Sequence, residues 1–239
     1  MDLNLLFTYK IVLMQNKEEN KPLSSQLIEV TVTGNEEISP DVYLISWKRM
    51  HDFQPGQVVK ITDNPELTPR IYSICSGNKE DEIRVLFNVK QGGLLTPRLA
   101  GMIPGMKIFV SEPYGSFKDA KQPSCWIAGG TGIAPFYSMF RSGYSENKTL
   151  IHGVSYLSHF YFEDELEEAM GERYIRCCSR EQSCNVFPGR ITRYLEEIND
   201  LPADINYYLC GKALMVVEVR DLLISKGVPF ENILAEIYF

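Results

Sequence analysis

The sequence predicts an N-terminal antiparallel β-barrel followed by an α/β domain with a doubly wound parallel sheet. Residues 26–120 contain short runs of alternating apolar and polar residues separated by turn residues, a pattern typical of small antiparallel barrels. Residues 121–239 instead alternate short apolar runs with helical segments, which indicates crossover connections between parallel strands. We therefore expect two domains, preceded by an extension over residues 1–25.

The first domain is expected to contain six strands and one short helix. The strand-forming runs are LIEVTVTG, DVYLISWKR, GQVVKIT, RIYSIC, IRVLFNV and MKIFVSE. Pro55 and Gly56 favour a tight turn into the third run, and PRLAGM is helical in character. The extension includes the apolar stretch LNLLFTYKIVLM, which lacks the basic start and cleavage site of a signal peptide. We expect this stretch to form a strand.

The second domain is expected to contain five strands with helices between them. The strands are CWIAGG, TLIHGV, YIRCCS, INYYLCG and NILAEIYF. The helices are APFYSMFRSG, FEDELEEAM, RITRYLEEI and ALMVVEVRDLLISKG. This order predicts a sheet of the kind that binds nucleotides at the carboxyl ends of its strands.

Composition excludes several functional classes. A net charge of −7 argues against a general nucleic-acid binder, and no apolar run reaches the length of a membrane span. The spacing of the six cysteines matches neither a zinc site nor an iron–sulfur loop, so we expect no metal. Without a signal peptide, reduced thiols and a cytoplasmic location are expected.

Three motifs point to phosphate-bearing, ring-containing ligands. The turn GGTGIAP (129–135) follows the first strand of the second domain and opens a helix, which favours a dinucleotide, although it could be a plain tight connection. GGLLTP (92–97) is a second anion-binding turn or merely a helix cap. RIYSICS (70–76) places an arginine beside a tyrosine, as a ligand site or as an ordinary edge strand.

Together these motifs resemble the ferredoxin–NADP(+) reductases and their flavin-dependent relatives, from about residue 26 to the last residue. RIYSICS resembles the flavin motif Arg-x-Tyr-Ser-x-x-Ser, and Gly93-Leu94-Leu95-Thr96 the flavin-phosphate motif. GGTGIAP resembles the nicotinamide-nucleotide loop, and the segment 208–211 (YLCG) the late Cys-Gly motif. The ending EIYF is similar to the bacterial branch, which carries one aromatic residue beyond the flavin-covering tyrosine.

The resemblance implies FAD and NADP(H) as cofactors and assigns residues to the flavin. Arg70 would pair with the pyrophosphate, and Tyr72 and Tyr238 would cover the two faces of the flavin ring. Ser73 would hydrogen-bond near the flavin N5. Phe239 would hold the adenine. The phosphate and ribityl region would be contacted by Asn88, Val89, Lys90, Gly93, Leu94, Leu95 and Thr96.

The resemblance also assigns the nicotinamide nucleotide site. Cys210 and Glu236 would flank the nicotinamide and act in catalysis with Ser73 and Tyr238, although by themselves they could be a buried thiol and a surface carboxylate. The dinucleotide would contact Gly130, Thr131, Gly132, Pro135, Cys210 and Gly211. Its 2′-phosphate would meet Ser179, Arg180 and Arg190, the last of which could equally be a surface charge. One departure is Ser155, where bacterial relatives often carry an arginine.

The activity implied is hydride transfer between NADPH and FAD, followed by single-electron transfer to a separate ferredoxin or flavodoxin. One alternative is the reductase component of an oxygenase, or a free-flavin reductase. Another is a non-catalytic module that senses NADPH.

Overall fold

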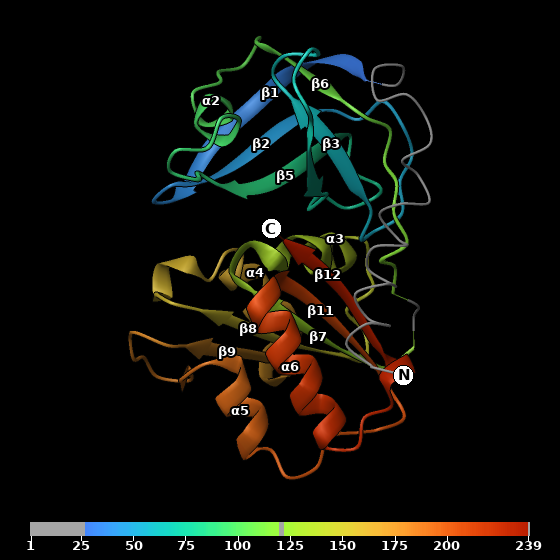
Figure 1. Cartoon of the computed structure of the whole chain (residues 1–239), viewed down its shortest axis with the longest axis vertical. Coiled ribbons are helices and arrows are strands. Elements are labelled where there is room, and N and C mark those ends of the chain that lie inside the picture. Colours follow the sequence, from blue (N-terminus) through green and yellow to red (C-terminus); the bar gives the residue numbers. More distant parts are fainter. Residues whose placement is uncertain (1–26, 120–121, 239) are drawn as a thin grey trace.

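The computed structural model describes residues 27–119 and 122–238, apart from the side chain of Tyr238. Two domains are stacked along the long axis, with the barrel above the parallel sheet in Figure 1. The predicted strand in the N-terminal extension lies outside the described residues. The predicted boundary between residues 120 and 121 falls on two residues that are also outside them, so it stays a prediction.

The first domain is an antiparallel sheet that closes into a barrel, as predicted. Its strands are β1 (Ile28–Ser39), β2 (Val42–Lys48), β3 (Val58–Thr62), β4 (Arg70–Ser73), β5 (Glu82–Asn88) and β6 (Lys107–Val110). They are ordered β4-β3-β6-β1-β2-β5, and a bridge between Ile74 and Val85 joins the two ends of this order. The short helix α2 (Thr96–Ala100) lies between β5 and β6. Alternate residues such as Val30 and Val32 point into the barrel core.

The second domain is a parallel sheet, again as predicted. Its strands are β7 (Ser124–Gly129), β8 (Lys148–Val154), β9 (Tyr174–Cys178), β10 (Phe187–Pro188), β11 (Asn206–Lys212) and β12 (Ile233–Tyr238). The helices are α3 (Ala134–Arg141), α4 (Glu163–Met170), α5 (Ile191–Glu197) and α6 (Ala213–Ser225). Short 3-10 turns are η1 (Gly130–Ile133), η2 (Leu157–His159), η3 (Gly171–Arg173) and η4 (Phe230–Asn232). The two-residue β10 was not predicted, because so short a strand carries no alternation.

Helices cover both faces of this sheet. On β7, Trp126 packs in a cluster with residues of α3 and α4, whereas its neighbour Ile127 packs with residues of α5 and α6. The first cluster also includes Val42 and Leu86 of the barrel, so the two domains share part of one apolar core. No helix within residues 27–119 and 122–238 has the length and apolar character needed to cross a bilayer.

The strand order places the topological switch point of the sheet between β7 and β11. The order is β10-β9-β8-β7-β11-β12, so the chain moves outward from β7 in one direction and then returns to its other side. Parallel sheets bind ligands where the order reverses, at the carboxyl ends of the strands. Here that edge faces the barrel, because β12 ends at the level where the two domains meet (Figure 1).

Candidate functional site

A polar cluster joins the barrel to the end of the sheet. Ser73, the last residue of β4, donates a 2.8 Å hydrogen bond to Oε2 of Glu236 on β12. The Cys210 thiol lies 4.0 Å from the same carboxylate oxygen. Ser73 and Cys210 are both buried, at 2% and 0% exposure. The structure therefore brings together three of the four residues predicted to be catalytic.

Glu236 titrates close to neutral pH. Burial raises the pKa of its carboxyl to about 7, and the hydrogen bond from Ser73 partly opposes that shift. A carboxyl group with such a pKa can hold or release a proton near neutral pH, which distinguishes it from the surface carboxylate that was the alternative interpretation.

The predicted nucleotide loop, residues 129–135, packs against the Cys-Gly segment. A Cβ added to Gly132 would lie 2.3 Å from the carbonyl oxygen of Cys210 and 2.9 Å from the Cα of Gly211. Gly211 itself has a φ of 151°, and a Cβ added to it would lie 3.2 Å from the Cα and the backbone nitrogen of Gly129. Only glycines allow the two backbones to approach so closely at the switch point. Pro135 occupies the first turn of α3, as predicted.

The flavin-type strand β4 presents its side chains in two environments. Arg70 is exposed, whereas Tyr72 is half-buried and packs edge-on against Phe87 with ring centres 6.2 Å apart. Burial raises the pKa of Tyr72 to about 12, so the phenol stays neutral. The strand thus presents an exposed guanidinium and a neutral aromatic ring.

The predicted flavin-phosphate turn is closed by its own hydrogen bonds. The Lys90 N–H donates to Oγ1 of Thr96 (2.9 Å), and the Gly93 N–H donates to the Lys90 carbonyl (2.8 Å). Because Thr96 accepts here, its hydroxyl proton remains available to a ligand. Leu95 is buried in the barrel core, while Leu94 is 76% exposed. Asn88 ends β5, and the N–H of the following Val89 donates to the Asp41 carbonyl.

Of the predicted 2′-phosphate residues, Ser179 and Arg180 follow β9 and Arg190 precedes α5. Arg180 donates through Nη1 to the Tyr156 hydroxyl (2.7 Å) and lies over that ring, 5.4 Å from its centre. The Arg180 N–H donates to the carbonyl of Ser155, so the two loops are fixed to each other. Ser179 directly follows β9, and Arg190 is an exposed residue at the start of α5. Tyr156 was missed from the sequence, where nothing distinguished it from other loop tyrosines.

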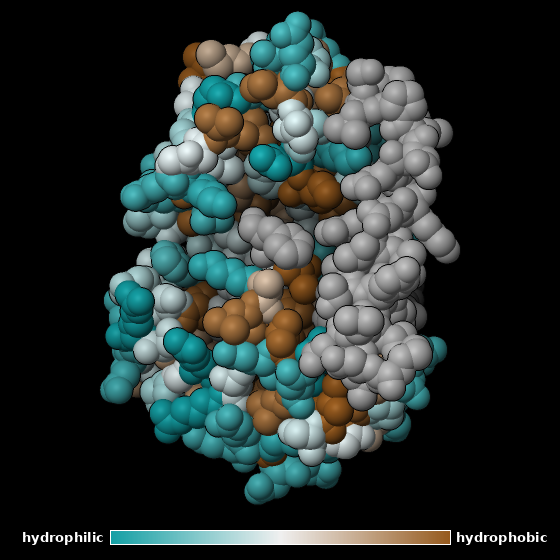
Figure 2. Space-filling model, in the orientation of Figure 1, coloured by the Kyte–Doolittle hydropathy of each residue, from teal (hydrophilic) through white to brown (hydrophobic). Residues whose placement is uncertain are grey.

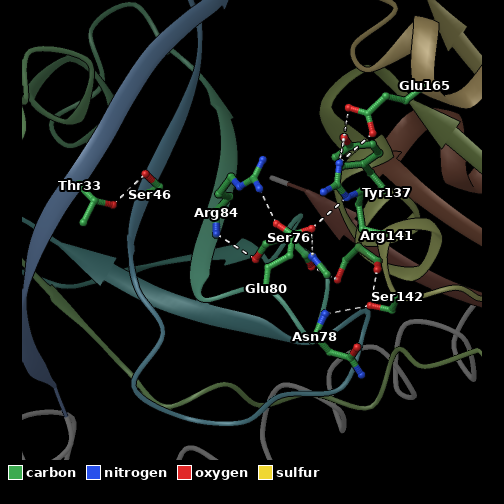
Figure 3. Close-up of polar contacts among 12 residues, drawn as sticks. Thr33, Ser46, Ser76, Asn78, Glu80, Arg84, Tyr137, Arg141, Ser142 and Glu165 are labelled. Atoms are coloured by element: carbon green, nitrogen blue, oxygen red, sulfur yellow. Dashed lines mark hydrogen bonds and ion pairs between the residues drawn. The ribbon is translucent and has the colours of Figure 1, made fainter.

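An interdomain network docks α3 on the loop that follows β4 (Figure 3). Arg141 lies between Oε1 of Glu80 in the barrel domain (2.9 Å) and Oε2 of Glu165 on α4 (2.8 Å). Ser138 donates to the carbonyl of Ser76, the last residue of the flavin-type motif. This network fixes the helix behind the nucleotide loop relative to the strand that carries Ser73.

Two predicted residues cannot be placed in the site. Phe239 lies outside the described residues, and Tyr238 is described only by its backbone, which pairs with Lys212. Hydrophobic side chains gather on both sides of the domain boundary in Figure 2. Sequence reasoning also missed His152, a fully buried residue that contacts the nucleotide loop; its position inside an apolar strand was the available signal.

Comparison with known proteins identifies the second domain. Residues 126–221 match the family described as "Oxidoreductase NAD-binding domain". The chain is 30% identical, over 75% of its length, to the toluate 1,2-dioxygenase electron transfer component of Pseudomonas putida. It is 27% identical, over 73% of its length, to the 2-halobenzoate 1,2-dioxygenase electron transfer component of Burkholderia cepacia. The matches cover 57% and 56% of those two relatives, so the chain spans just over half their length.

The two-domain fold matches solved structures along nearly the whole chain. A ferredoxin NADP+ reductase from Neisseria gonorrhoeae, solved with bound FAD and NADP, superposes with a TM-score of 0.81 at 21% identity. The match covers 90% of this chain and 100% of that one, and at this identity it concerns the fold.

Fold and site together define an oxidoreductase in which a barrel is joined to a nucleotide-binding sheet. The NAD-binding family match, the dioxygenase electron transfer relatives and the ferredoxin reductase fold together support an oxidoreductase of the ferredoxin–NADP(+) reductase type. The resemblance inferred from the sequence is confirmed.

Proposed function

We propose that the chain is a FAD-dependent reductase that oxidises NADPH and passes electrons singly to a separate ferredoxin or flavodoxin. The observation that carries this proposal is the cluster of Ser73, Cys210 and Glu236. It unites the flavin-type strand of one domain with the nucleotide crevice of the other, which is where two stacked cofactor rings would have to meet.

The barrel residues fit FAD. Arg70 offers an exposed guanidinium for the pyrophosphate, and Tyr72 offers a neutral ring for one face of the flavin. The closed turn at residues 90–96 leaves the Thr96 hydroxyl proton for a phosphate oxygen. The tail residues Tyr238 and Phe239 are proposed to cover the other face and the adenine, on the strength of the EIYF ending.

The sheet residues fit a pyridine nucleotide. The glycines of the nucleotide loop permit close backbone approach to a pyrophosphate, and Arg180 supplies a positive charge for a 2′-phosphate. We propose NADPH rather than NADH because of Arg180, with Ser179 as a hydroxyl donor and Arg190 as a second cation.

The protein's own contribution is alignment and proton control. When bound, FAD supplies the ring that accepts hydride and the capacity to release electrons one at a time. Ser73 donates a hydrogen bond to Oε2 of Glu236 and so orients the carboxyl, whose near-neutral pKa lets it hold or release a proton where the two domains meet. Cys210, which is fully buried, lies beside the same carboxylate oxygen. Alignment of this kind supplies much of the rate of a transfer between bound rings.

The flavin is tested by mass spectrometry of the small molecule released from the purified protein. We expect FAD, and a protein that carried only FMN would disprove the role of Phe239. Steady NADPH-dependent reduction of a dye is also expected, and its absence in flavin-loaded protein would favour the non-catalytic sensor.

A second candidate is the reductase component of an oxygenase. It is favoured by the two dioxygenase electron transfer components among the relatives. Reduction assays with purified ferredoxin, flavodoxin and a terminal oxygenase of the same organism separate the two candidates. Faster reduction of the oxygenase than of either carrier would replace the first proposal with the second.

We further propose a cytoplasmic location. All six cysteines are free thiols, five of them buried, as is usual in proteins of a reducing compartment.

A further inference from the structure

His152 lies directly behind the nucleotide loop. It is on β8, paired in register with Ala128 of β7, and its side chain is fully buried. Aromatic rings enclose it: the centres of Phe160, Tyr161 and Tyr174 lie 5.5, 6.5 and 6.4 Å from the centre of the imidazole. A polar ring in such a place must satisfy both of its nitrogens, because an unpaired buried polar group is costly.

Both nitrogens have a partner, and the partners settle which one carries the proton. Nε2 lies 3.1 Å from the carbonyl oxygen of Gly130, and Nδ1 lies 3.2 Å from the Tyr174 hydroxyl. A carbonyl can only accept, so Nε2 carries the hydrogen and donates it to Gly130. Nδ1 is then an acceptor, and the Tyr174 hydroxyl donates to it.

The imidazole is also held neutral. Burial lowers the pKa of His152 to about 4, and burial raises that of the Tyr174 phenol. Neither group changes charge near neutral pH. Both hydrogen bonds therefore keep their direction near neutral pH: Tyr174 donates to His152, and His152 donates to the Gly130 carbonyl.

Gly130 is the residue at which the loop leaves the sheet. Its φ of 56° lies in the left-handed region, and it begins the 3-10 turn that leads into α3. The orientation of its peptide decides how the next residues, Thr131 and Gly132, enter the crevice beside Cys210. The His152 side chain on the neighbouring strand β8 holds that peptide through a hydrogen bond to the Gly130 carbonyl.

We propose that His152 is a positioning residue, which holds the Gly130 carbonyl so that the loop keeps the shape that receives the cofactor pyrophosphate. This inference rests on the proposed function of the same site. It assigns His152 no contact with either cofactor.

Three substitutions of the flavin-loaded protein test the donor at Nε2. His152→Gln can place an amide N–H near the position of Nε2, His152→Asn is too short to do so, and His152→Leu has no donor. Tyr207→Phe is the matched control: Tyr207 is also fully buried, and its hydroxyl donates 2.8 Å to the Pro202 carbonyl at the opposite end of the sheet. Binding of NADP(+) is measured by isothermal titration calorimetry, beside steady-state kinetics with NADPH.

We expect His152→Asn and His152→Leu to raise the dissociation constant of NADP(+) about two- to tenfold, the range for one lost hydrogen bond. KM for NADPH should rise by the same factor with kcat unchanged, since the loop binds a part of the cofactor that does not react. His152→Gln should stay within about twofold of the wild type, and Tyr207→Phe should not alter binding.

The inference is overturned if the His152→Asn and His152→Gln variants bind NADP(+) equally well. It is also overturned if Tyr207→Phe weakens NADP(+) binding as much as His152→Asn does. The contrast between Asn and Gln, both polar, decides the question even if the Leu variant does not fold. Failure of the proposed function would look different, because the wild-type protein itself would then bind no pyridine nucleotide.

Discussion

Ser73 and Glu236 stand 163 positions apart in the chain, and a 2.8 Å hydrogen bond joins them. One residue ends the flavin-type strand of the barrel and the other belongs to the last strand of the sheet. The bond therefore reports directly on the relative placement of the two domains. It also makes the pKa of Glu236 depend on how the two domains are placed, because the Ser73 hydrogen bond affects that pKa.

The first prediction concerns the pH dependence of stability. In the folded protein the pKa of Glu236 is about 7, above its ordinary value of 4.5. The folded state thus binds the proton more tightly than the unfolded state, and this stabilises the fold. The stabilisation is fully present below pH 4.5 and is lost as the pH rises through about 7. The loss amounts to about 3 kcal/mol at most.

Glu236→Gln removes this titration and should flatten the dependence. The free energy of unfolding in urea, measured from pH 5 to 8, should fall more steeply in the wild type than in the variant. Parallel curves for the two proteins would contradict the raised pKa.

The second prediction concerns the close approach at the switch point. Gly132→Ala places a Cβ 2.3 Å from the Cys210 carbonyl oxygen, so the backbone has to move. We expect a loss of about 1–3 kcal/mol in the free energy of unfolding, the range for overpacked interiors, and at least tenfold weaker NADP(+) binding.

Gly101→Ala is the control for this substitution. Its Cβ would meet no atom closer than 3.6 Å, and its φ of −82° suits any residue. In the Gly101→Ala variant, the free energy of unfolding and the affinity for NADP(+) should both stay near the wild-type values. Normal nucleotide binding by Gly132→Ala would show that the two loops do not need their present contact.

The third prediction concerns the choice between NADPH and NADH. A charge-assisted hydrogen bond contributes about 1.5–3 kcal/mol, so Arg180→Ala should raise KM for NADPH roughly ten- to a hundredfold. NADH kinetics should barely change, and turnover at saturating NADPH should be retained. The effect should shrink at high salt.

Arg193→Ala provides the comparison, because Arg193 is likewise a surface arginine placed over an aromatic ring. It should leave both cofactors unaffected. Equal losses with NADPH and NADH in Arg180→Ala would disprove its 2′-phosphate role, and so would no loss with either.

The fourth prediction concerns the interdomain network of Arg141. Its guanidinium bonds Glu80 and Glu165 at once, which the single ammonium of a lysine cannot reproduce. Because the side chain is 32% exposed, solvent screens these pairs, and Arg141→Lys should cost about 1 kcal/mol in urea unfolding. Arg193→Lys, which alters the exposed pair with Glu197 and the contacts with Phe187 and the Pro188 carbonyl, should cost less. Equal costs would mean that the network adds nothing beyond an ordinary surface pair.

Much of the fold was predictable because its signals are local. Alternation along β1 and the glycines of GGTGIAP depend on neighbouring residues, so they indicate a half-buried strand and a tight phosphate-binding turn without knowledge of the rest. The segment RIYSICS by itself left a ligand site and an ordinary edge strand open, and only the family resemblance assigned it to the flavin. The family resemblance supplied the roles of Cys210 and Glu236, which in themselves were only a thiol and a carboxylate.

Tertiary structure alone decided which of these residues meet. The sequence contains no local sign that β11 inserts beside β7 and brings Cys210 against Gly132, because strand order results from how the whole sheet packs. The raised pKa of Glu236 arises from burial at a domain boundary, and the role of His152 from a carbonyl 22 positions away. Periodicity predicts elements because it is a property of neighbours, whereas burial and hydrogen bonding at a site depend on residues that only folding brings into contact.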